Sequence, residues 1–172
     1  MKKLLILGAG GYGKTVADVA QQLGLYDEIA FLDDGKVNEP DVLGGCGDFL
    51  SFAGEETAFY PAFGNNQTRM AWLGKLLEHG SEVPTLVHPA AYVSPRATLG
   101  TGVVVLPKAV VNTGCVVHDG CIINIGALID HDVVMEPGSH AAPGAIVKAE
   151  NRIPAGMKIE AGRVIENRQY PL

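Results

Sequence analysis

His131 is followed directly by Asp132 in the tetrapeptide Ile129-Asp130-His131-Asp132. A free imidazole has a pKa near 6.5, so it can accept a proton near neutral pH. A neighbouring carboxylate can hold its tautomer and stabilise the cation. This combination predicts a general base. The alternative is a solvated surface histidine, which is the commoner situation for a single exposed ring. No serine or cysteine accompanies His131, which favours direct transfer of a group over a covalent intermediate.

Two further polar residues stand close to this pair in a stretch that is otherwise apolar. Asn124 lies seven residues before His131 and offers an amide that could contact a substrate, whereas His140 lies nine residues after it. A packing or capping role is the alternative interpretation for His140.

The elements that must position these residues show a period of six. Every sixth residue from Val87 to Ile165 is apolar, and small or polar residues, many of them glycine, follow three positions later. Neither a helix, with period 3.6, nor a half-buried strand, with period 2, has this pattern. It predicts a parallel β-helix of triangular coils, in which residues eighteen apart stack at the strand spacing of about 4.8 Å. His131 then occupies a corner and points outward.

The beginning of the chain has a different organisation. An apolar strand at 4–7 precedes Gly8-Ala9-Gly10-Gly11-Tyr12-Gly13, a helical pattern covers 14–23, and a second strand at 29–32 ends at Asp33-Asp34. This order is typical of a nucleotide-binding βαβ unit, in which the glycine turn and the free N–H groups of the helix accept a phosphate. The acids can accept hydrogen bonds from a ribose or a base. A glycine-rich turn kept for packing is the alternative.

A third strand is expected at 57–63, followed by Gly64 and Asn65, and Asn65 or Asn66 is expected to cap a helix that runs to about 79. The ends of the three strands should meet at one edge of a parallel sheet and form one pocket. The polar stretch 35–54 is expected to be a loop. We place the domain boundary near residue 84, giving a Rossmann-like α/β domain of βαβαβ type at 1–84 and a β-helix at 85–172. The first domain is too small for a dinucleotide fold and should hold a mononucleotide.

Composition narrows the classes of function. The 172 residues carry a formal net charge of −6 and include 22 glycines, and 47% of them are hydrophobic. An acidic chain is a poor ligand for nucleic acid or anionic membranes, and no apolar run is long enough to span a bilayer. The basic and apolar beginning of the chain is interrupted by glycines and is interpreted as a strand, not a signal peptide. The three cysteines show neither a disulfide nor a metal spacing, and we expect no metal and a cytoplasmic location.

The chain resembles the sialic-acid O-acetyltransferase-like family of left-handed β-helix acyltransferases. The segments that carry the resemblance are, in order, the glycine loop, Phe31-Leu32-Asp33-Asp34, Gly64-Asn65-Asn66, the hexapeptide repeat and the segment from Asn124 to His140. Within that family the chain is most similar to the UDP-4-amino-sugar N-acetyltransferases of the bacillosamine pathway in protein glycosylation. The resemblance covers nearly the whole chain. It implies an acetyl-CoA donor, a UDP-linked amino sugar as acceptor, and a homotrimer with active sites between neighbouring β-helices.

The resemblance also implies roles for individual residues. His131 would be the general base and Asp132 its partner, while His140 and Gly144 would lie near the acetyl group. The residues implied to bind the nucleotide sugar are Gly10, Gly11, Tyr12, Gly13, Asp33, Asp34, Gly64, Asn65 and Asn124. An oxyanion donor is expected from a backbone N–H beside Gly144 or from the ring of His140.

Two features depart from the family pattern. The usual Gly-His-Gly of the loop is Gly11-Tyr12-Gly13 here, so a role of that histidine passes to Tyr12 or is lost. The β-helix is also shorter, and the missing coils help to hold coenzyme A in the family. The chain could be a module of a larger bifunctional protein. Small residues expected on one outer side of the β-helix favour trimer packing: Ala90, Ala91, Ala97, Ala109 and Ala127.

Two other functions remain as alternatives. One is an O-acetyltransferase acting on a sialic acid or a related sugar, and the other is a non-catalytic trimeric scaffold that binds a nucleotide. The paired acids Asp33-Asp34 with Gly64-Asn65 favour a substrate that carries a nucleotide over a free sugar. The pair His131-Asp132 argues against the scaffold.

Overall fold

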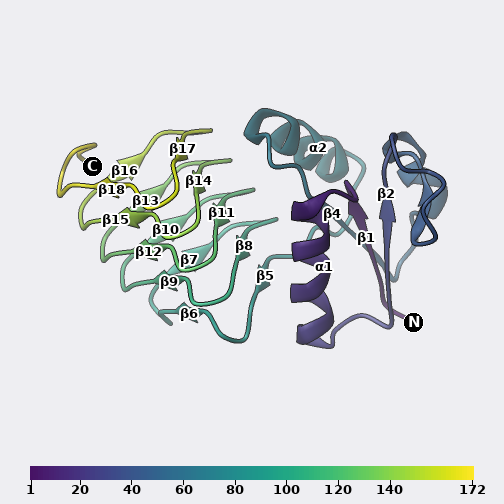
Figure 1. The fold of residues 1–172 in the computed structure, drawn as a ribbon, viewed down its shortest axis with the longest axis horizontal. Coiled ribbons are helices and arrows are strands. Elements are labelled where there is room, and N and C mark those ends of the chain that lie inside the picture. The colour runs from purple at the N-terminus through teal and green to yellow at the C-terminus, as the bar shows by residue number, and fades with distance from the viewer. The chain divides into compact units, whose positions relative to one another are not determined.

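The computed structural model describes all 172 residues and divides into two compact units, Met1–Pro84 and Thr85–Leu172. The N-terminal unit is an α/β fold around a four-stranded parallel sheet with strand order β3-β2-β1-β4. Its elements are β1 (Lys3–Leu7), α1 (Gly11–Leu23), β2 (Glu28–Leu32), β3 (Val42–Gly44), the 3₁₀-helix η1 (Cys46–Phe52), β4 (Thr57–Pro61) and α2 (Asn66–Glu78) (Figure 1).

The register of this sheet brings the ends of three strands to one edge. Leu7, at the end of β1, pairs with Leu32 of β2 on one side and with Pro61 of β4 on the other. Residues 4–7 are completely buried, as expected for a central parallel strand that is covered on both faces. The expected gathering of three strand ends is therefore confirmed.

Two local signals determine where the helices begin and end. Helix α1 ends at Gly24, which has the left-handed conformation (φ 64°) that only glycine adopts without strain. Helix α2 begins at Asn65, whose side chain accepts a hydrogen bond from the backbone N–H of Thr68 at 2.9 Å. Of the two asparagines considered as caps, Asn65 is the one that caps the helix.

The expectation of a structureless loop at 35–54 is wrong. This segment contains β3, which adds an edge strand to the sheet, and the 3₁₀-helix η1. The helix buries Cys46 and Phe49 in the core of the unit. At its start, the side chain of Asp48 accepts a hydrogen bond from the backbone N–H of Gly45 at 2.9 Å. Two buried side chains in a polar stretch gave no periodic pattern from which a helix could be predicted.

The C-terminal unit is a parallel β-helix, as the period of six predicted, and it is left-handed, as the family resemblance implied (Figure 1). Its strands are β5 (Leu86–Val87), β6 (Tyr92–Val93), β7 (Thr98–Leu99), β8 (Val104–Val105), β9 (Val110–Val111), β10 (Val116–Val117), β11 (Ile122–Ile123), β12 (Leu128–Ile129), β13 (Val134–Met135), β14 (His140–Ala141), β15 (Ile146–Val147), β16 (Arg152–Ile153), β17 (Lys158–Ile159) and β18 (Val164–Ile165). They form three parallel sheets of four, five and five strands. Each strand pairs with the strand eighteen residues away, as Ile123 does with Val105 and Ala141.

The second residue of each strand points into the β-helix and forms its core. From Val105 to Ile165 these positions are at most 1% exposed. From Val103 to Asn151, the residue two places before each of them, such as Cys121 or Ala127, also faces inward at a corner. The expected outer row of alanines is therefore wrong in part, because Ala109 and Ala127 are completely buried in this core. A small residue at that position fills the corner of the triangle from inside.

The first residue of each strand points away from the core. On the sheet β6-β9-β12-β15-β18 these outward residues are all apolar: Tyr92, Val110, Leu128, Ile146 and Val164. We call this row the apolar face. Tyr92 is 54% exposed and Leu128 is 41% exposed, and a shallow hollow of about 250 Å³ lies over Val110, Leu128 and Ile146.

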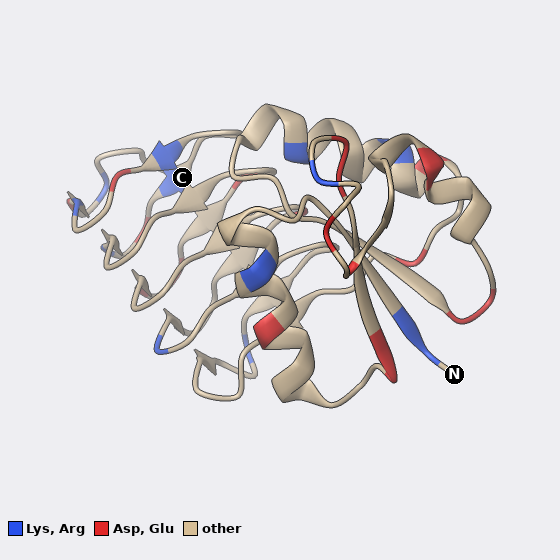
Figure 2. Ribbon diagram, turned by 45° about the vertical axis from the view of Figure 1, so that its right-hand side comes forward, with Lys and Arg blue, Asp and Glu red and all other residues tan.

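Charged residues of both signs are interspersed along both units (Figure 2). No helix combines the length and the apolar composition that crossing a bilayer requires. No group of three or more histidine, cysteine, aspartate or glutamate side chains is placed to hold a metal ion.

Candidate active site

His131 and Asp132 form a hydrogen-bonded pair at the corner between β12 and β13. Nδ1 of His131 lies 2.8 Å from Oδ2 of Asp132, and the two side chains are 46% and 57% exposed. A carboxylate can only accept, so the ring donates from Nδ1, and Nε2 keeps its lone pair. The hydrogen bond to Asp132 raises the pKa of His131, and the charges of Asp130, Asp132 and Glu150 act in the same direction. This is the geometry of a base that is oriented by a carboxylate.

The backbone at Asp132 is in a left-handed conformation, with φ 56°. Equivalent corners are occupied by glycines, among them Gly126 (φ 65°) and Gly138 (φ 69°). A residue with a side chain is disfavoured in this region, although aspartate tolerates it better than most. Asp132 shares this conformation with three other residues that carry side chains, Lys108, Glu150 and Arg168.

Asp130 holds the backbone of His131 in place. Its Oδ1 accepts from the N–H of His131 at 2.8 Å and from Nδ2 of Asn112 at 3.3 Å. Asn112 stands eighteen residues before Asp130 and is therefore its neighbour in the preceding coil. Neither Asn112 nor Asp130 was predicted to have a role. A polar residue found one coil before another polar residue is the signal that could have identified the pair.

Asn124 and His140 form a second hydrogen-bonded pair. Oδ1 of Asn124 accepts from the backbone N–H of Ile125 at 2.8 Å, which turns its Nδ2 toward Nε2 of His140, 3.0 Å away. Because Nε2 accepts this hydrogen bond, the proton of the ring is on Nδ1. His140 is 8% exposed. Asn124 follows β11, and His140 is the first residue of β14, which belongs to the same sheet as β11. His131 follows β12, which belongs to another sheet, so the two pairs are on different sides of the triangle.

The backbone N–H groups at and beside Gly144, one of the two expected oxyanion donors, are hydrogen-bonded within the chain. The backbone N–H of Gly144 donates to the carbonyl of Ile125 at 2.9 Å, and that of Ala145 donates to Ala142 at 3.0 Å. The first hydrogen bond joins neighbouring coils, and the second closes the turn within one coil. Ser139, which precedes His140, is completely buried with its hydroxyl 3.3 Å from Sγ of Cys121. It is not placed to act as a nucleophile.

In the N-terminal unit, the predicted nucleotide residues gather at one edge of the sheet. Gly10 and Gly11 follow β1, Asp33 and Asp34 follow β2, and the exposed residues Gly64 and Asn65 follow β4. No side chain caps helix α1, and no acidic residue lies in its first turn. The free N–H groups and the positive end of the helix dipole therefore favour an anion at this place.

Asp33 and Asp34 also have structural roles. Oδ2 of Asp33 accepts from the N–H of Ala9 at 2.8 Å, and Oδ1 accepts from Gly35 at 2.9 Å. Oδ1 of Asp34 accepts from the N–H of Cys46 at 2.7 Å. Asp33 thus holds the glycine loop against β2, and Asp34 holds the start of η1. Each carboxylate has further lone pairs for a ligand.

Two residues of the glycine loop are occupied by packing. A Cβ on Gly13 would lie 1.9 Å from the carbonyl oxygen of Gly8, so this glycine is needed where the helix passes the strand. The hydroxyl of Tyr12 lies 3.4 Å from that of Tyr60. Removal from water raises the pKa of Tyr12 to about 12. Gly10 and Gly11 are exposed, and a Cβ on either would meet nothing within 4 Å.

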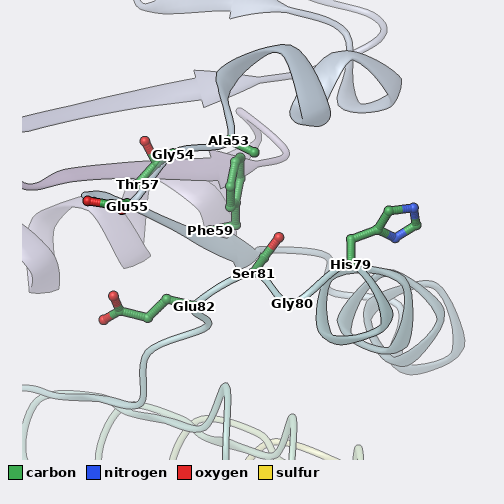
Figure 3. Close-up of a pocket in the computed structure, with 9 residues that line it drawn as sticks. All are labelled: Ala53, Gly54, Glu55, Thr57, Phe59, His79, Gly80, Ser81 and Glu82. Carbon is green, nitrogen blue, oxygen red and sulfur yellow. The ribbon is translucent and has the colours of Figure 1, made fainter.

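A cavity of about 330 Å³ in the N-terminal unit is not part of this arrangement (Figure 3). It lies where β4 begins and α2 ends, and its lining includes Thr57, Phe59 and His79. Because the strands are parallel, this is the opposite edge of the sheet from Asp33 and Gly64.

Comparison with known proteins agrees with the fold. Residues 3–76 match the model of the PglD N-terminal domain family. The acetyltransferase domain of PglB from Neisseria gonorrhoeae FA1090 is 38% identical, with a TM-score of 0.94, over 98% of this chain and 84% of that chain. This chain belongs to the same family of β-helix acetyltransferases.

Two further structures show relatives with their ligands. The same gonococcal domain in complex with acetyl coenzyme A is 39% identical, with a TM-score of 0.92, over 97% of this chain and 83% of that chain. PerB from Caulobacter crescentus, in complex with CoA and GDP-perosamine, is 22% identical with a TM-score of 0.65, over 96% of this chain and 92% of that chain. At that identity the likeness to PerB shows the fold alone.

Proposed function

We propose that this acetyltransferase moves the acetyl group of acetyl-CoA to the 4-amino group of a UDP-linked amino sugar, forming UDP-N,N′-diacetylbacillosamine. The observation that carries the proposal is the hydrogen bond between His131 and Asp132 at an exposed corner. Membership of the family that includes the PglB acetyltransferase domain supports the type of reaction. The complex of that domain with acetyl coenzyme A supports the donor.

His131 acts as the base in this proposal. An amino sugar is largely an ammonium ion near neutral pH and cannot attack until a proton leaves. Nε2 of His131 takes that proton, the nitrogen attacks the thioester carbonyl carbon, and the C–S bond breaks as the N–C bond forms. The proton on His131 then passes to the departing thiolate, and the nitrogen releases its surplus proton to water, which leaves an amide, a thiol and one free proton. Asp132 stabilises the imidazolium that exists between these steps.

The N-terminal unit binds the nucleotide end of the acceptor. The uncapped start of α1 and the exposed Gly10 and Gly11 fit a diphosphate, which approaches the backbone closely. Asp33 and Asp34 accept hydrogen bonds from the uridine with the lone pairs that the backbone does not use. A single βαβ unit with these features favours a mononucleotide over NAD.

The active enzyme is a homotrimer with sites between the β-helices of neighbouring chains. Within one chain the pair His131–Asp132 and the pair Asn124–His140 follow strands of different sheets. Packing one side of the triangle against the next chain around a threefold axis can bring unlike corners together. A cytoplasmic location remains a prediction.

The test is to mix the protein with acetyl-CoA and a panel of UDP-amino sugars, GDP-amino sugars and free sialic acids, and to follow thiol release. We expect release with a UDP-4-amino sugar. In His131→Ala, kcat should fall by about 10²- to 10⁴-fold, the usual contribution of a positioned base, with little change in substrate binding. A fully active His131→Ala protein would contradict the assignment of His131 as the base. Release only with a free sugar would identify an O-acetyltransferase. No release with any sugar of the panel would favour the alternative function, a non-catalytic scaffold that binds a nucleotide.

A further inference from the structure

Gly114 occupies the same corner as Asp132, one coil earlier. The strands before the two residues pair through Val111 and Ile129, and the N–H of Asp132 donates to the carbonyl of Thr113 at 3.0 Å. Both residues are left-handed, with φ 71° at Gly114 and 56° at Asp132. Their backbones therefore stack directly on one another.

The carboxylate of Asp132 fills the space that a side chain at Gly114 would need. A Cβ on Gly114 would lie 2.3 Å from Oδ1 of Asp132 and 3.3 Å from its carboxyl carbon. The other oxygen, Oδ2, is the one that faces Nδ1 of His131 at 2.8 Å. The carboxylate is thus placed between the ring of His131 on one side and the bare Cα of Gly114 on the other.

The backbone conformation alone does not require glycine here. Lys108, Glu150 and Arg168 adopt the same left-handed conformation at corners of this β-helix, with φ between 55° and 61°. Glu150 and Arg168 stand at the same corner as Gly114, in the two coils that follow Asp132. A side chain is therefore accepted at this corner wherever the coil beyond leaves room for it.

Gly114 also differs from other glycines of the β-helix corners. A Cβ on Gly126, Gly144, Gly156 or Gly162 would meet nothing within 4 Å, although their φ angles are 65° to 68°. The close approach of a functional carboxylate separates Gly114 from these four.

We propose that Gly114 is a positioning residue for the pair His131–Asp132: its missing side chain makes the room in which the Asp132 carboxylate turns toward the imidazole. Gly114 touches no reacting atom and acts only through Asp132. The inference rests on the proposed role of His131 as base. A methyl group at Gly114 displaces the carboxylate, because Oδ1 is the mobile end of a side chain, and the displacement breaks the hydrogen bond to Nδ1.

The experiment compares Gly114→Ala with Gly162→Ala, which introduces the same strain at φ 68° but into open space. The ring of His131 is titrated by NMR, and its signal is assigned by its loss in His131→Gln. We expect the pKa of His131 to fall in Gly114→Ala and to stay unchanged in Gly162→Ala. The other charges near the ring, Asp130 and the Glu150–Arg168 ion pair, are the same in both variants. Equal titration curves for the two variants would overturn the proposal.

Kinetics provide a second measurement. Gly114→Ala should lower kcat by up to about 10²-fold, the cost of a misplacement near 1 Å, and should leave KM unchanged. In the double variant with Asp132→Ala, Gly114→Ala should lower kcat no further, because the carboxylate that it would displace is already absent. Additive losses would show that Gly114 acts by another route.

Two features keep the test decisive. If Gly114→Ala does not fold, the matched pair Gly114→Asn and Gly162→Asn replaces it, since asparagine tolerates the left-handed region well. The titration needs no substrate. Its outcome therefore judges the role of Gly114 independently of whether the acetyl acceptor has been identified correctly.

Discussion

The candidate base and its partner lie at a single corner of the β-helix, and the residues around them differ in how easily their roles can be predicted from the sequence. His131 and Asp132 are evident because they are polar residues in an otherwise apolar, glycine-rich repeat. Asn112 and Gly114 are not, because each acts on a residue eighteen positions away and becomes meaningful only when the coils are stacked. The repeat gave the stacking distance, but side-chain orientation at the corner depends on the left-handed backbone at Asp132.

The pH dependence of the reaction should report the charge of Asp132. The base must be neutral, so kcat/KM falls as pH drops below the pKa of His131, which the hydrogen bond to Asp132 raises. Asp132→Asn keeps an acceptor but removes the charge, and the acid limb of the profile should move to lower pH. A limb caused by the amine of the substrate would not move. An acid limb in the same place in both proteins would contradict the assignment to His131.

At the scale of elements, Asp33 supports the edge of the N-terminal sheet that is proposed to bind the nucleotide. Asp33→Ala removes the acceptor for two backbone N–H groups, at Ala9 and Gly35, and so loosens the glycine loop and also removes the proposed uridine contact. We expect KM for the nucleotide sugar to rise and KM for acetyl-CoA to stay nearly constant. Asp18→Ala, which changes an exposed carboxylate on α1, is the control. A rise confined to acetyl-CoA would show that the two substrates have been assigned to the wrong units.

The last coil of the β-helix is closed by one buried side chain. Asn151 is completely buried, donates to the carbonyls of Lys148 and Glu166 at 2.8 Å each, and accepts from the N–H of Tyr170 at 2.8 Å. The ring of Tyr170 packs on the core behind it. The sequence could not show this, because Asn151 bonds to Glu166 and Tyr170, which lie beyond Ile165, where the hexapeptide pattern ends.

Asn151→Ala should therefore destabilise the β-helix. The two carbonyls and the N–H of Tyr170 lose their partner, and an unsatisfied buried polar group costs about 1–3 kcal/mol. A chain of this size should lose roughly 2–4 °C in Tm for each kcal/mol. Thermal unfolding followed by circular dichroism measures the change, with Asn38→Ala at an exposed position as the control. Equal Tm values in the two variants would show that the terminal coil contributes nothing to stability.

At the scale of the whole molecule, the two units differ in how far their structure could be predicted. The β-helix could be predicted from the period of six, which matches neither a helix nor an ordinary strand. The α/β unit could be predicted from the order of a strand, a glycine turn, a helix, a second strand and an acidic pair. The exceptions, β3 and η1, depend on the burial of Cys46 and Phe49, and the outward row of alanines failed in part because Ala109 and Ala127 face inward. Periodicity identified which positions repeat, but not which way a corner residue points.

The apolar face provides the surface on which the predicted trimer can be tested. Its row of Tyr92, Val110, Leu128, Ile146 and Val164 leaves large side chains in water, and the hollow over Leu128 is rimmed by Asn112, Asp130 and Lys148. An apolar patch with a polar rim is typical of a protein interface. Leu128 directly precedes Ile129 in the strand that leads to His131, so a chain seated on this face would lie beside the candidate base.

Leu128→Asp should convert the predicted trimer into monomers at micromolar concentration and abolish acetyl transfer. The free energy needed to bury an unpaired carboxylate exceeds the stabilisation that an apolar contact at this position provides. Thr98→Asp places the same charge at an exposed outward position of another sheet and should remain trimeric and active. Light scattering measures the mass of both proteins. A trimer that survives Leu128→Asp but dissociates in Thr98→Asp would move the interface to the sheet β7-β10-β13-β16. If the unaltered protein were an active monomer, His131 and Asp132 would have to act without a neighbouring chain.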